Sequence, residues 1–79
     1  MTFDELEAVR DYDDIRRVHN TAGLFLLNKS RLTAHCSPFD CTEVDQVTPR
    51  KIVGNVAWRI ATDAQVRALG GGWCTNCCS

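Results

Sequence analysis

Residues 70–79 read GGGWCTNCCS, and the interpretation of the whole chain starts from this stretch. Three of the five cysteines lie in the last six residues, behind a run of three glycines and a tryptophan. The end of a chain usually frays unless something holds it in place. We therefore expect a bound metal ion to clamp this segment onto the rest of the molecule.

The other two cysteines lie in HCSPFDC at residues 35–41, where Pro38 and Asp40 favour a tight turn. They form a C-x4-C pair, and CTNC at residues 74–77 forms a C-x2-C pair. Two short-spaced pairs far apart in the sequence suit a tetrahedral thiolate site, in which the ion joins distant parts of the chain. The predicted ligands of one structural zinc ion are Cys36, Cys41, Cys74 and Cys77, with His35 and Cys78 as substitute ligands.

Three other interpretations of the cysteines stay open. An iron–sulfur cluster also takes four thiolates, although these spacings do not reproduce a ferredoxin motif. Thioredoxin-like exchange requires CTNC to begin a helix, whereas here it closes the sequence. In the simplest alternative, Cys36 and Cys41 are small buried residues and the tail is loose. The presence of two pairs favours zinc.

Length and composition predict a single zinc-stabilised domain over residues 1–79. Hydrophobic residues make up 44% of the 79 residues and charged residues 24%, but a core of this size alone gives only marginal stability. The N-terminal MTFDELEAVRDYDD is too acidic for a signal peptide, and the longest apolar run, AGLFLL at 22–27, is too short to span a membrane. We expect a cytoplasmic protein without membrane contact, whose odd number of cysteines serves a metal and not disulfides.

The first part of the sequence contains two helix patterns. TFDE at residues 2–5 is a capping box, which predicts a short helix carrying Phe3, Leu6 and Val9. DYDD at 11–14 interrupts this pattern and supplies a second cap. Helical spacing of the following apolar residues predicts a second helix over about 14–29. Those apolar residues are Ile15, Val18, Ala22, Phe25 and Leu26.

The second half begins with TEVDQV at 42–47, which we expect to be a short extended segment. Thr48 and Pro49 then predict the start of a third helix, whose apolar face is formed by residues of 52–60. A strand is the alternative for 52–60, because the apolar residues also alternate there, but the cap favours the helix.

TDAQVRALGG at 62–71 predicts the last helix, with Asp63 as its cap and Gly70 at its end. The sequence contains no internal repeat. The expected fold is thus a small, irregular all-α domain of about four short helices stapled by one structural zinc site.

Catalysis has little support, because four thiolates around zinc leave no coordination position for water, and we predict that the protein is not an enzyme. On a helix over 52–60, Trp58 falls on the polar side, and an exposed tryptophan is a typical anchor of a protein interface. The leading hypothesis is a small non-enzymatic adaptor or regulatory protein that binds a larger protein partner through Trp58.

Charge suggests a second hypothesis. Net charge is −1, yet residues 1–14 hold six acids and one arginine, so the basic residues concentrate in the remainder. A basic face for nucleic-acid binding would consist of Lys29, Arg31, Arg50, Lys51, Arg59 and Arg67. A thiol redox sensor is a weaker third alternative.

Overall fold

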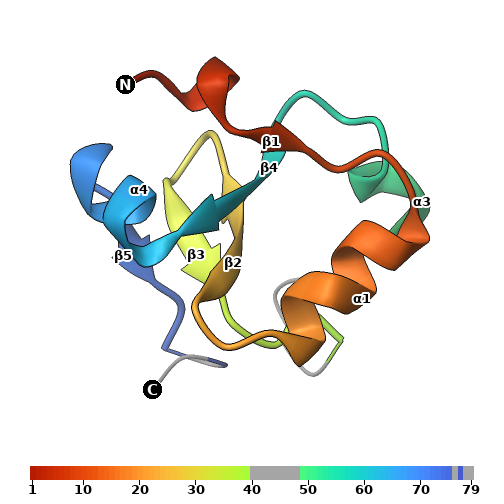
Figure 1. Ribbon diagram of the computed structural model, residues 1–79. Coiled ribbons are helices and arrows are strands. Elements are labelled where there is room, and N and C mark those ends of the chain that lie inside the picture. The colour runs from red at the N-terminus through yellow and green to blue at the C-terminus, as the bar shows by residue number, and fades with distance from the viewer. Residues whose placement is uncertain (40–48, 76, 78–79) are drawn as a thin grey trace.

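The computed structural model describes residues 1–39, 49–75 and 77, and these form an α+β fold around a five-stranded mixed sheet (Figure 1). The strands are β1 (Glu7–Ala8), β2 (Leu24–Asn28), β3 (Thr33–His35), β4 (Trp58–Thr62) and β5 (Gly72–Trp73). The helical elements are the short 3-10 helix η1 (Phe3–Glu5) and the α-helices α1 (Tyr12–Asn20), α3 (Pro49–Ile52) and α4 (Asp63–Ala68).

The prediction of an all-α domain is wrong, and the clearest error concerns residues 14–29. Helix α1 ends at Asn20, and the apolar run that follows forms strand β2 instead of continuing the helix. Gly23 separates the two elements with a φ of 87°, a backbone conformation that glycine adopts without a steric penalty. The first four residues of strand β2, LFLL, are all apolar because β2 is the central strand of the sheet and is covered on both faces.

The predicted third helix is also shorter than expected. Helix α3 ends at Ile52, the chain turns at Gly54 with a φ of 72°, and β4 begins at Trp58. The strand alternative is therefore correct from Trp58 onward. The extended segment predicted at 42–47 lies outside the described residues.

At the N-terminus, the predicted helix is limited to η1. The Glu5 carboxylate accepts a hydrogen bond from the Thr2 N–H at 3.4 Å, as the capping box predicts. Leu6 then adopts an extended conformation, and the chain enters strand β1. Phe3, Leu6 and Val9 are nevertheless all buried, Phe3 and Leu6 in one hydrophobic cluster and Val9 in another.

The sheet has the strand order β1-β4-β2-β3-β5. All neighbouring pairs are antiparallel except β3 and β5, which run parallel with Ala34 opposite Trp73. The longest ladder joins β2 to β4, from Leu24 opposite Thr62 to Asn28 opposite Trp58. This order brings the segment around residue 35 beside the segment around residue 73, far apart in sequence.

Each face of the sheet has its own hydrophobic core, and Leu26 and Leu27, both fully buried, point into different ones. Helices α1 and α4 lie on opposite sides of the sheet (Figure 1). The core on the α1 face, here called the α1 core, contains Val9, Ile15, Val18, Leu26, Ile52, Trp58, Ile60 and Cys74. The core on the α4 face, the α4 core, contains Phe3, Leu6, Leu27, Ala34, Ala61 and Val66.

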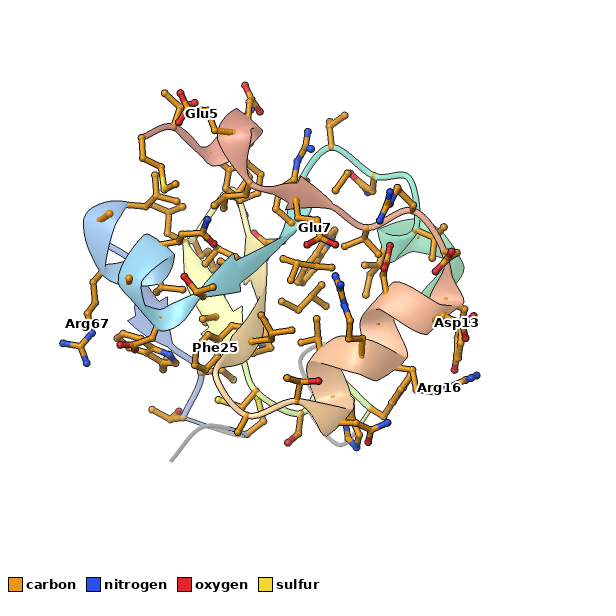
Figure 2. All side chains as sticks on the ribbon, in the orientation of Figure 1. Glu5, Glu7, Asp13, Arg16, Phe25 and Arg67 are labelled. Carbon is orange, nitrogen blue, oxygen red and sulfur yellow. The ribbon has the colours of Figure 1, made fainter. Side chains whose placement is uncertain are left out.

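Helix α1 starts at an Asp11 cap, whose carboxylate accepts from the Asp14 N–H at 3.0 Å. Its inner side buries Ile15 and Val18, while Asp13 and Arg16 form an ion pair on the outer side (Figure 2). Within the described ranges, no helix has the length and apolar character that a membrane span requires.

Helix α4 confirms the predicted last helix, with the cap shifted by one residue. The Thr62 hydroxyl accepts from the Gln65 N–H at 3.3 Å, and the Gln65 side chain accepts in return from the Thr62 N–H at 2.9 Å. The helix ends before Gly70, which has a φ of 72°. The Gly71 N–H then donates to the Val66 carbonyl at 2.9 Å, which turns the chain directly into β5.

Candidate metal centre

His35 is the last residue of β3 and is only 4% exposed. Its position is fixed from one side by the antiparallel ladder, in which it pairs with Leu26 of the central strand. Because Leu26 belongs to the α1 core, and paired residues share a face of the sheet, the imidazole also lies on the α1 face. Its ring centroid is 5.8 Å from that of Trp58, which is in the same core.

Cys74 directly follows β5 and is 3% exposed. Its N–H donates to the Ala34 carbonyl at 2.8 Å, so the parallel pairing with β3 continues one residue past the strand. Ala34 is opposite Trp73, so the next residue on the β3 side is His35 and the next residue on the β5 side is Cys74. The parallel register therefore places the imidazole and the thiol side by side.

Cys77 completes the group, since its side chain lies beside His35 at the end of β3. Its Sγ lies 3.9 Å from the Nδ1 atom of His35, and it packs half-buried against the α1 core. The ligand atoms of His35, Cys74 and Cys77 all lie within 4.8 Å of one another. Two ligands of a tetrahedral zinc ion, bound at the usual Zn–S and Zn–N lengths, are about 3.6–3.8 Å apart. These three side chains could therefore hold a metal ion after small rotations.

Of the predicted zinc ligands, the structure brings together Cys74 and Cys77, and it adds His35, which the sequence offered only as a substitute. Cys36 is half-buried and disulfide-bonded, so the expectation that the cysteines form no disulfide is wrong for this residue, whereas Cys74 and Cys77 are in the reduced thiol form. Cys41 and Cys78 lie outside the described residues. The four-cysteine ligand set therefore stays a prediction.

The expected exposure of Trp58 is wrong, because only 7% of this residue is accessible and its indole belongs to the α1 core. The cause is the strand at 58–62, in which Trp58 and Ile60 point to the same buried face. A side chain enclosed in this way offers no surface to a partner protein, so Trp58 is a core residue beside the candidate metal centre.

Two residues of the predicted basic face, Lys29 and Arg67, form ion pairs with carboxylates. Lys29 lies 3.9 Å from an Asp4 oxygen, and Arg67 lies 3.0 Å from an Asp63 oxygen. Three of the other acidic residues near the N-terminus, Glu7, Asp13 and Asp14, pair with arginines of the same region; Figure 2 labels Glu7, Asp13 and Arg16 among these residues. Glu7 is one example: it accepts a hydrogen bond from Arg17 and raises the pKa of that guanidinium.

The aromatic residues outside the two cores form a small exposed cluster. Tyr12 and Phe39 stack with ring centroids 5.5 Å apart, and the Arg16 guanidinium lies 5.5 Å from the Tyr12 ring centroid. Tyr12 is 45% exposed and Phe39 36% exposed. No periodic pattern in the sequence predicts this cluster, because Phe39 comes from the segment that follows β3 and not from α1 itself.

Comparison with known proteins identifies no relative: no family model matches the chain, and neither the curated proteins nor the solved structures include a significant match. The candidate metal centre therefore rests on the chemistry and position of its own side chains.

Proposed function

We propose that this chain is a small, non-enzymatic zinc-binding protein, in which one ion fixes the segment after β5 to the end of β3. The observation that carries the proposal is the convergence of His35, Cys74 and Cys77 within 4.8 Å. The fourth ligand would be one of the three remaining cysteines, Cys36, Cys41 or Cys78. Cys36 would serve only after reduction of its disulfide.

The donor set favours zinc over an iron–sulfur cluster. A thiolate pair in a C-x2-C turn combined with an imidazole is a common ligand set of structural zinc sites. Most iron–sulfur clusters are bound by four thiolates, so the imidazole of His35 would not be a ligand of such a cluster. A buried thiol–imidazole hydrogen bond without metal is the plain alternative, because 3.9 Å between Sγ and Nδ1 also allows that contact.

A structural role follows from the position of the site. Two of the three donors are almost fully buried, which leaves little room for a substrate at the ion. The ion would also join segments that are held together otherwise by short strands, since β5 contains only Gly72 and Trp73. Apparent free energies of about 10 kcal/mol are typical for structural zinc, which is large compared with a core of this size.

A protein partner is proposed in preference to nucleic acid because of the charge pattern. Among the residues that the structure describes, five cationic side chains lie within 4.0 Å of a carboxylate, so they offer phosphates a largely neutralised surface. These residues are Arg10, Arg16, Arg17, Lys29 and Arg67. The exposed Tyr12, Arg16 and Phe39 side chains are of the types enriched in protein interfaces, and they replace Trp58 as the proposed contact surface.

Metal analysis is the decisive test. Protein purified under reducing conditions should contain one zinc per chain, and Cys77→Ser should lose most of it. Thr75→Ala is the matched control, because Thr75 lies exposed between the two cysteines and should leave the zinc content unchanged. A folded protein without stoichiometric metal would refute the proposal and favour the thiol–imidazole hydrogen bond.

The choice of partner has its own test. Titration with duplex DNA at low and moderate salt should show no salt-dependent binding, and pull-down from host lysate should retain a protein that Tyr12→Ala loses and Lys51→Ala keeps. Lys51 is exposed and on a different helix, so it controls for a general surface effect. Binding that falls steeply with salt would support the nucleic-acid alternative instead.

A further inference from the structure

Cys74 and Cys77 differ in accessibility although they belong to one group. Cys74 is 3% exposed, whereas Cys77 is half-buried, so a small solute can reach the Cys77 sulfur more easily. Both carry reduced thiols, and their sulfurs lie within 4.8 Å of each other. An accessible cysteine beside a second, protected one is the usual arrangement of a redox-sensitive pair.

We propose that Cys77 and Cys74 form a peroxide-sensitive pair, in which Cys77 is oxidised first and Cys74 resolves it into a disulfide, with release of the zinc ion. This inference rests on the proposed zinc site and names its regulation. A disulfide requires the two sulfurs to approach to about 2 Å from their present separation of at most 4.8 Å, and Cys-X-X-Cys is the spacing of known disulfide-forming pairs.

The chemistry balances with hydrogen peroxide as the oxidant. The Cys77 thiolate attacks one peroxide oxygen, so an S–O bond forms, the O–O bond breaks, and the departing hydroxide is protonated to water. The Cys74 thiolate then attacks the Cys77 sulfur, so the S–S bond forms and the S–O bond breaks, which releases a second water after protonation. Two thiolates lose two electrons, and the peroxide gains them.

The consequence for the metal follows from its ligands. The disulfide removes two of the four proposed ligands from the ion, and His35 with one remaining ligand would retain zinc far more weakly against water. The new bond lies within one turn, so unlike the metal it does not tie the segment to β3. Cys36 is already disulfide-bonded next to His35, which indicates that the fold accommodates an oxidised cysteine at this position.

The test uses the reduced, zinc-loaded full chain, whose metal content is measured before oxidant is added. Hydrogen peroxide is then titrated while a chromogenic chelator reports zinc, and the tryptic peptide after Arg67 is mapped by mass spectrometry. We expect one zinc released per disulfide formed, and a Cys74–Cys77 bond within that peptide.

Two variants separate the roles of the cysteines. In Cys74→Ala the sulfenic acid on Cys77 should persist and be trapped by a cyclic dione, whereas in Cys77→Ala trapping at Cys74 should be several-fold weaker. The same trapping experiment is repeated with both variants unfolded in denaturant. The difference in trapping between Cys77 and Cys74 should then vanish, because it arises from the different burial of the two side chains.

The outcomes distinguish this inference from the zinc proposal. A chain that contains no zinc before peroxide refutes the proposed function and, with it, the release of zinc. Zinc that is present but stays bound while peroxide is consumed, or a disulfide that joins Cys74 or Cys77 to another cysteine, overturns the redox inference alone.

Discussion

On the α4 face of the sheet, the buried core consists of hydrocarbon and aromatic side chains such as Leu27 and Val66, while on the α1 face the core ends at an imidazole and two sulfurs. Both faces are covered by one main helix and draw on the same strands. Leu26 and Leu27 are consecutive in β2 and equally buried, yet one pairs with His35 and the other with Ala34. The faces therefore differ in chemistry and not in the extent of burial.

The two faces of the sheet are therefore stabilised in different ways. Apolar burial contributes free energy in proportion to area, and it depends weakly on pH, metal or oxidant. A metal centre contributes only when its ligands are deprotonated and the ion is present. We expect the α4 face to be insensitive to solution conditions and the α1 face to depend on them.

Removal of metal should have the largest effect. Chelation of zinc from the reduced protein should lower the free energy of unfolding by up to about 10 kcal/mol, measured by urea denaturation. Amide exchange should show which face responds: the Cys74 N–H, bonded to the Ala34 carbonyl, should lose more protection than the Gly71 N–H, bonded to Val66. Equal loss at both amides would mean that the faces do not unfold separately.

Trp58→Ala should cost about 3–5 kcal/mol, because it removes a large buried side chain from the α1 core. Trp58→Phe is the control, since it keeps an aromatic ring in that position, and it should cost less. Thermal and urea unfolding followed by circular dichroism measure both. A Trp58→Ala variant as stable as the parent chain would contradict the burial of the indole.

Leu26→Ala and Leu27→Ala form a matched pair with one substitution on each face. Each should lower the free energy of unfolding by about 2–5 kcal/mol, because both side chains are fully buried. Only Leu26→Ala should also weaken zinc binding, since Leu26 is opposite His35 in the ladder. Competition with a chelator of known affinity measures this second effect, and equal weakening in both variants would contradict the separation of the faces.

Gly71→Ala and Gly72→Ala should differ although the glycines are neighbours. A Cβ at Gly71 would lie 2.7 Å from the Leu32 carbonyl oxygen and 3.1 Å from a Val66 methyl, whereas a Cβ at Gly72 meets nothing within 4 Å. We expect about 1–3 kcal/mol of destabilisation for Gly71→Ala from overpacking, and almost none for Gly72→Ala. Equal thermal stability of the two variants would contradict the close approach of β5 to Leu32.

The helix starts and the end of α4 were the most predictable part of the fold, although Asp63 and not Thr62 was the predicted cap of α4. The predicted ends of the second and third helices were wrong. Asp11 and Thr62 both cap helices through side-chain oxygens, and Gly70 terminates one, because caps and stops depend on residues within a single turn. Strand β2 was not predictable in the same way. A strand covered on both faces is apolar throughout, so LFLL continued the helical spacing of Ile15 and Val18 and gave no alternation.

The candidate site could be predicted in part. CTNC identified two donors, because the spacing of a metal-binding turn is local. The role of His35 depends on the parallel pairing of β3 with β5, which joins segments distant in sequence and leaves no local signal. Because His35 and Cys36 are adjacent in the sequence, they indicated a position with several metal-binding side chains. Only the register of β3 against β5 places the imidazole of His35 beside Cys74.

The placement of the two tryptophans makes each face separately visible to fluorescence. Trp58 lies in the α1 core beside His35, whereas Trp73 packs against the α4 core, with its ring centroid 5.9 Å from Phe25 and 5.4 Å from the Arg67 guanidinium. Replacement of either indole by phenylalanine would leave a single emitter that belongs to one face. Stopped-flow refolding of the two single-tryptophan chains would then record the order in which the faces form, with no attached label.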